Sequence, residues 1–87
     1  MIRIERRYIP SARQHLWTIY LDNSLWRTVD SLTKVVKEIS ELVEVSIISI
    51  NTNIQVDTGT SAYPDHFYAG DFLQLGVAGL RKRLAIV

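Results

Sequence analysis

The fold is decided by the stretch Leu32-Thr33-Lys34-Val35-Val36-Lys37-Glu38-Ile39-Ser40-Glu41-Leu42-Val43. Its apolar side chains recur at spacings of three and four residues, which places them on one face of a helix. The charged side chains fall on the opposite face, where we expect solvent. A helix with one apolar face must bury that face against a second layer, and here we expect a β-sheet. The apolar positions are Leu32, Val35, Val36, Ile39, Leu42 and Val43, and the charged positions are Lys34, Lys37, Glu38 and Glu41.

The residues before this helix predict a tight hairpin. Residues 15–21 and 25–29 are rich in aromatic and β-branched residues, which favour strands. Between them, Asp22-Asn23 tolerates the positive φ that a two-residue hairpin turn requires. A single helix beginning at Ser24 is the alternative, because the apolar spacing also continues backward from the helix. Asp30-Ser31 offers a helix cap directly before the helix, so we favour a hairpin followed by a helix.

Further strands are expected at both sides of this unit. Residues 1–9 alternate between apolar and charged side chains, as a half-buried strand does, and Pro10-Ser11 ends the pattern. Residues 45–50 carry apolar side chains on both faces and predict a central strand. Residues 54–56 form either a second strand after a turn or a continuation of the first past a bulge.

The C-terminal part allows two readings. Residues 71–83 place apolar side chains at helical spacing, although two glycines within the stretch each cost about 1 kcal/mol in a helix. A hairpin turning at Ala78-Gly79 is the alternative. Residues 84–87 are too apolar to remain in water, so we expect them to join the sheet or to pair with another subunit.

These elements predict an α+β fold over residues 1–87 as a single domain. We expect a small antiparallel sheet of three to five strands packed against one amphipathic helix, with a C-terminal helix or hairpin. With 87 residues and an apolar fraction of 47%, the chain can build a core without metals or disulfides. The sequence has no cysteine and no run of apolar residues long enough to span a membrane, so we expect a cytoplasmic protein.

Charge is nearly balanced, since the formal net charge is +1. That value is far from the basic balance of most nucleic-acid-binding domains. The basic residues are unevenly placed, however, and would form one patch if the two ends of the chain meet in space. They are Arg3, Arg6, Arg7 and Arg13 near the start and Arg81, Lys82 and Arg83 near the end.

The long polar segment of residues 57–70 is the candidate binding site. It mixes turn-forming residues with aromatic rings, and aromatic side chains in a polar loop indicate contact with a partner. We expect no catalytic residue, no metal ligand set and no cofactor. The candidate binding residues are Asp57, Tyr63, Asp65, His66 and Tyr68.

One motif in this segment carries a catalytic signature. Val56-Asp57-Thr58-Gly59-Thr60-Ser61 follows an apolar run and resembles the active-site turn of the retroviral-type aspartic proteases. The subunits of that family dimerise to pair two aspartates. The resemblance implies that Asp57 would share a proton with its symmetry mate and activate water. Leu73-Gln74-Leu75-Gly76 is the candidate for the second segment that closes around the aspartate in that family.

We expect a small non-enzymatic interaction protein that binds another macromolecule or a small ligand through the aromatic loop. A homodimer is expected, because the C-terminus is apolar and Trp17 and Trp26 suit a core or an interface. A single-stranded nucleic-acid binder that uses the terminal arginines and the aromatic rings is the first alternative. A dimeric aspartic protease acting through Asp57 is the second.

Overall fold

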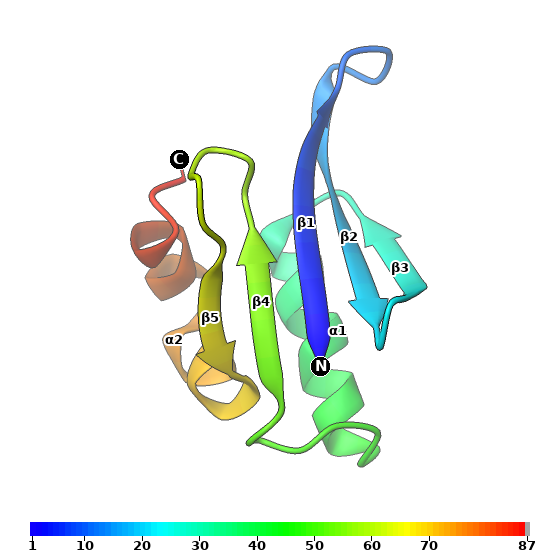
Figure 1. Cartoon of the computed structure of the whole chain (residues 1–87), viewed down its shortest axis with the longest axis vertical. Coiled ribbons are helices and arrows are strands. Elements are labelled where there is room, and N and C mark those ends of the chain that lie inside the picture. Colours follow the sequence, from blue (N-terminus) through cyan, green and yellow to red (C-terminus); the bar gives the residue numbers. More distant parts are fainter. Residues whose placement is uncertain (87) are drawn as a thin grey trace.

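The protein has an α+β fold in which a five-stranded sheet carries two helices (Figure 1). The structure is a computed structural model, and it describes residues 1–86. The predicted fold class is confirmed. In chain order the elements are β1 (Ile2–Ile9), β2 (Gln14–Leu21), β3 (Ser24–Val29), α1 (Leu32–Glu44), β4 (Asn53–Asp57), β5 (Asp65–Tyr68) and α2 (Ala69–Arg83).

The sheet is mixed, with strand order β3-β2-β1-β4-β5. The expected antiparallel pairing holds for β1–β2, β2–β3 and β4–β5. The β1–β4 pair is parallel, and it joins residues 2–5 to residues 54–57. Parallel neighbours need a crossover connection, and α1 lies within the crossover here.

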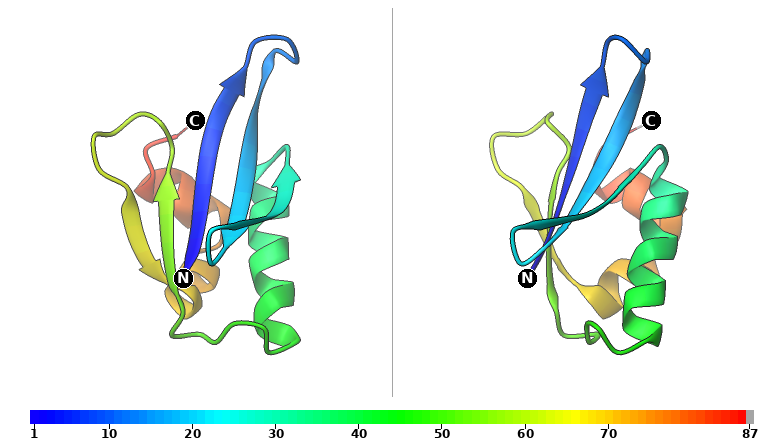
Figure 2. Two further views of the ribbon diagram at one scale, coloured as in Figure 1. Left: turned by 45° about the vertical axis from the view of Figure 1, so that its right-hand side comes forward. Right: turned by 90° about the vertical axis from the view of Figure 1, so that its right-hand side faces the viewer.

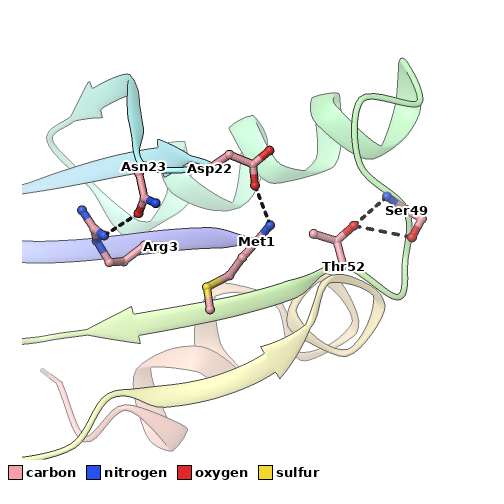
Figure 3. Close-up of polar contacts among 6 residues, drawn as sticks. All are labelled: Met1, Arg3, Asp22, Asn23, Ser49 and Thr52. Carbon is pink, nitrogen blue, oxygen red and sulfur yellow. Dashed lines mark hydrogen bonds and ion pairs between the residues drawn. The ribbon is translucent and has the colours of Figure 1, made fainter.

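The predicted hairpin between β2 and β3 is confirmed. Asp22 and Asn23 have φ values of 47° and 70°, the left-handed backbone of a two-residue turn. The terminal amine of Met1 donates to Asp22 Oδ1 at 2.9 Å, and Arg3 Nη1 donates to Asn23 Oδ1 at 3.2 Å (Figure 3). These contacts attach the turn to the first strand, so the chain before α1 forms a three-stranded meander.

The predicted amphipathic helix is confirmed as α1. Ser31 is its cap, because its backbone is extended and its Oγ accepts a hydrogen bond from the amide of Lys34 at 3.2 Å. The apolar face points into the core, where Leu32, Val35, Ile39 and Leu42 are buried.

The predicted strand over residues 45–50 is wrong. Residues 45–52 form an irregular connector that returns the chain from the end of α1 to the start of β4. Ser46 has a φ of 63°, and Ser49 and Thr52 close a turn through their hydroxyl and backbone groups (Figure 3). Val45, Ile47 and Ile50 remain exposed. The strand that follows the helix is β4, and it includes residues 54–56, which were predicted as a possible second strand.

The predicted long loop is shorter than expected, because β5 forms within it. Phe67 of β5 is buried and lies edge to face with Phe72, with 5.8 Å between the ring centroids. The C-terminal alternative is decided in favour of a helix, α2. Gly76 interrupts this helix with φ 67° and ψ −178°, which produces a kink.

Both helices cover the same face of the sheet, and the opposite face is open (Figure 2). The core between the layers holds Ile4, Ile19, Ile54 and Phe72, each with no more than 1% of its surface exposed. Trp17 and Leu84 are buried in the same core, and Ile86 packs against it. Of the apolar C-terminal stretch, position 87 lies outside the described residues. Within residues 1–86, no helix is long and apolar enough to cross a membrane.

Candidate functional site

A hollow of about 630 Å³ lies beside β5, between this edge strand and α2. We call it the β5–α2 groove. Its volume falls within the range of about 300–1,000 Å³ that ligand-binding clefts occupy. The lining residues are Asn53 of β4, His66, Phe67 and Tyr68 of β5, and Asp71, Gln74, Leu75 and Arg83 of α2.

The groove has an aromatic floor with a cation above it. Phe67 is 7% exposed and belongs to the core, so the floor is rigidly supported. The guanidinium carbon of Arg83 lies 5.5 Å from the centroid of the Phe67 ring, within the range of a cation–π contact. Tyr68 and Leu75 expose 55% and 38% of their surfaces and provide apolar walls.

Opposite charges occupy the two ends of α2 where it lines the groove. Asp71 is in the first turn and Arg83 is in the last turn, each the sign that the helix dipole favours at that end. Both side chains are exposed. Among the described residues, neither forms an ion pair within the chain. A ligand in the groove therefore meets a negative end and a positive end.

The strand that forms one wall of the groove has a free edge. β5 pairs with β4 on one side, and it is the last strand of the sheet on the other. Backbone N–H and C=O groups along such an edge are available to another strand. Residues 65–68 contain no lysine and no proline, and Asp65 is the one acidic residue of this four-residue strand. The edge of β5 is chemically able to accept an added strand.

The kink at Gly76 shapes the helical wall. A β-carbon placed at Gly76 would meet nothing within 4 Å, so the glycine is required by its backbone conformation and not by crowding. The kink interrupts the helix directly after Leu75, which lines the groove.

The structure brings two of the five predicted binding residues into this groove, His66 and Tyr68. Asp65 is at the start of β5, half-buried and paired in register with Val56. Tyr63 is 82% exposed in the β4–β5 loop and does not line the groove. Of the remaining lining residues, Phe67 belongs to β5, and the others come from β4 and α2. These lining residues of β4 and α2 lie outside the 57–70 segment, so no pattern within that segment indicates them.

Asp57, the fifth predicted residue, is engaged in a local turn at the end of β4. Its Oδ1 accepts a hydrogen bond from the amide of Gly59 at 2.9 Å. Thr58 is buried, with its Oγ1 2.7 Å from that of Thr60. The segment proposed by the protease resemblance to close around the aspartate, residues 73–76, lies in α2. The aspartate turn of the protease resemblance is therefore present, whereas residues 73–76, the proposed second segment, lie in a helix.

The sheet also carries a polar row across its open face. Register places Tyr20, Arg3, Gln55 and His66 side by side on neighbouring strands. Arg3 lies over the ring of Tyr20, with 4.3 Å between its guanidinium carbon and the ring centroid. This row leads from the centre of the sheet to the β5–α2 groove.

A titratable pair lies at the start of α1, away from the groove. Lys34 Nζ is 2.7 Å from Asp30 Oδ1, and this hydrogen bond, together with the charge of the lysine, holds the pKa of the Asp30 carboxyl below its ordinary value. Across residues 1–86, no three histidine or acidic side chains gather in a way that could hold a metal ion.

Comparison with known protein families, with curated proteins and with solved structures finds no match to this chain.

Proposed function

We propose that this protein is a non-enzymatic binding module that takes an extended segment of a partner protein along β5. The observation that carries the proposal is the β5–α2 groove, because it combines an unpaired strand edge with a lined hollow beside it. Strand addition of this kind obtains affinity from backbone hydrogen bonds and specificity from pockets for alternate side chains.

The dimensions of the groove suit a short peptide. The four residues of β5 span about 13 Å, since a strand rises about 3.3 Å per residue. Successive side chains of an added strand would point alternately toward α2 and toward the open face. Those facing α2 meet Leu75, and those facing outward meet Tyr68 and His66.

Charge complementarity defines the preferred sequence of the peptide. An acidic residue suits the Arg83 end of the groove and a basic residue suits the Asp71 end, with apolar residues between them. The partner is thus an extended, mostly apolar segment with opposite charges at its two ends.

We also propose a cytoplasmic homodimer. The sequence has no cysteine for a disulfide framework, which supports the location. Trp17 and Leu84, two of the residues that suggested a dimer, are buried within one chain. The surface that supports the proposal is instead the connector of residues 45–52, where Val45, Ile47 and Ile50 are each more than half exposed.

Selection of peptides tests the binding proposal. A phage-displayed library of random peptides is selected on the immobilised protein, and the enriched peptides are measured by fluorescence anisotropy. We expect apolar peptides with opposite charges at their ends. Tyr68→Ala and Leu75→Ser should each weaken binding at least tenfold, because both side chains line the groove. Backbone amides of β5 should gain protection from hydrogen exchange when the peptide binds.

Tyr63→Ala is the matched control, since it removes the same kind of side chain from an exposed loop position outside the groove. We expect it to change affinity less than twofold. The proposal fails if selection enriches no peptide, or if the enriched peptides bind the Tyr68 and Tyr63 variants equally well.

A further inference from the structure

The β1–β2 hairpin extends beyond the rest of the sheet as a two-stranded ribbon (Figures 1 and 2). β4 pairs with β1 only as far as Glu5, and β3 pairs with β2 only from Trp17 onward. The pairs from Arg7 with Leu16 to Ile9 with Gln14 therefore have no third strand beside them. At about 3.3 Å per residue these three pairs reach roughly 10 Å, and the turn adds to that length.

This ribbon, residues 6–17, is strongly basic. It contains Arg6, Arg7 and Arg13 and no acidic residue, whereas the formal net charge of the whole chain is +1. The rest of the chain is therefore net acidic. Arg13 is exposed at the turn, and within residues 1–86 it has no acidic partner. Arg7 exposes 67% of its side chain, and one of its nitrogens lies 3.3 Å from Glu5, which leaves its other donors for a ligand.

One further arginine lies at the base of the ribbon. Arg6 and His15 share a hollow of about 240 Å³ with Arg81 from the last turn of α2. The two ends of the chain therefore meet, which was the condition for a single basic patch. Asp30 also lines this hollow, and its carboxylate is paired with Lys34 at 2.7 Å. Arg6 lies over the ring of Trp17 at 5.8 Å, which fixes the base of the ribbon to the core.

We propose that this basic ribbon binds double-stranded DNA by entering its major groove. A two-stranded ribbon fits that groove, which is about 12 Å wide and about 8.5 Å deep, and the ribbon extends roughly 10 Å past the neighbouring strands before its turn. The major groove of duplex RNA is too narrow for such an element. The arginines supply the charge that phosphates on both sides of the groove require. This site is separate from the β5–α2 groove and does not depend on the peptide proposal.

Salt dependence of binding tests the proposal. Anisotropy of a fluorescent duplex DNA of about 20 base pairs is measured with the full chain at 50 and 200 mM salt. Three phosphate contacts predict that affinity falls roughly forty-fold over this range. The double variant Arg7→Gln/Arg13→Gln should bind at least tenfold more weakly at the lower salt. Between 50 and 200 mM salt, the affinity of this variant should fall only roughly three- to fourfold, as one remaining phosphate contact predicts.

The double variant Arg27→Gln/Lys37→Gln is the matched control, because it removes the same charge from β3 and α1, outside the ribbon. It should retain the forty-fold salt dependence. Circular dichroism confirms that both variants are folded. The proposal is overturned if duplex DNA does not bind at 50 mM salt, or if both double variants lose affinity equally. Equal or tighter binding of single-stranded DNA or duplex RNA would also overturn it.

Discussion

Two residues of the β2–β3 turn adopt a left-handed backbone conformation, which most residues with a side chain disfavour. Asp22 and Asn23 both have positive φ, and asparagine and aspartate tolerate this region better than other non-glycine residues. A local pair of residues therefore sets how β2 and β3 pair next to the turn.

We expect Asn23→Ala to lower the free energy of unfolding by about 1–2 kcal/mol, because alanine has no local compensation for left-handed backbone. Asn23→Gly should retain most of the stability. Both variants lose the hydrogen bond from Arg3, so the difference between them isolates the backbone effect. Urea unfolding followed by circular dichroism measures both, and equal midpoints would contradict the expectation.

A second residue-level prediction concerns pH. Because Lys34 depresses the pKa of Asp30 in the folded protein, the pair stabilises the fold above the ordinary aspartate pKa. That contribution is lost as the pH falls through the lowered value. Lys34→Gln should raise the pKa of the Asp30 carboxyl toward its ordinary value, as measured by an NMR titration of the side-chain carbonyl carbon. An unchanged titration would show that the lysine is not the cause.

At the scale of elements, the kinked helix α2 forms one wall of the candidate site. Its two halves meet at Gly76, whose φ of 67° and ψ of −178° belong to a region that is almost exclusive to glycine. The conformation of one residue therefore determines how α2 passes β5.

Gly76→Ala should destabilise the protein by about 1–3 kcal/mol, because alanine cannot adopt this backbone without strain. Gly79→Ala is the matched comparison in the same helix. There the new methyl group would lie 3.2 Å from the Cβ of Leu75, and this crowding opposes the gain in helix propensity of about 1 kcal/mol, so we expect a smaller loss of stability than at Gly76. Urea midpoints compare the two variants. If both tolerate alanine equally, the kink is not required by the fold.

Elements encoded by local pattern could be predicted from the sequence, and those set by distant contacts could not. Helix α1 and the β2–β3 turn are specified by neighbouring residues, through apolar spacing, the Ser31 cap and left-handed backbone. Residues 45–50 look like a buried strand because they are apolar, but their exposure is decided by where α1 ends relative to β4. Likewise, Arg83 reaches Phe67 only through the path of α2, which no local pattern reveals.

At the scale of the whole molecule, the exposed apolar side chains of the 45–52 connector are the feature that assembly would use. We expect the protein to be a dimer in light scattering coupled to size-exclusion chromatography, run at two concentrations. Val45→Ser/Ile47→Ser should give a monomer, with the stability of the chain itself changed by no more than about 0.5 kcal/mol. Leu25→Ser, which changes an equally exposed apolar residue in β3, should remain dimeric. A monomeric wild-type chain would contradict this expectation.

The parallel pairing of β1 with β4 also has a consequence for synthesis of the chain. β1 is made first, yet one of its edges finds its partner only when residues 54–57 have been translated. At about 5–20 residues per second, the ribosome needs roughly 3–10 seconds to cover that interval. During this time the β1 edge of the nascent hairpin is unpaired, and a strand of another chain could pair with it. The arginines of β1 carry positive charge along this edge, and like charges on two neighbouring nascent chains repel each other. We therefore expect them to reduce strand pairing between nascent chains during synthesis.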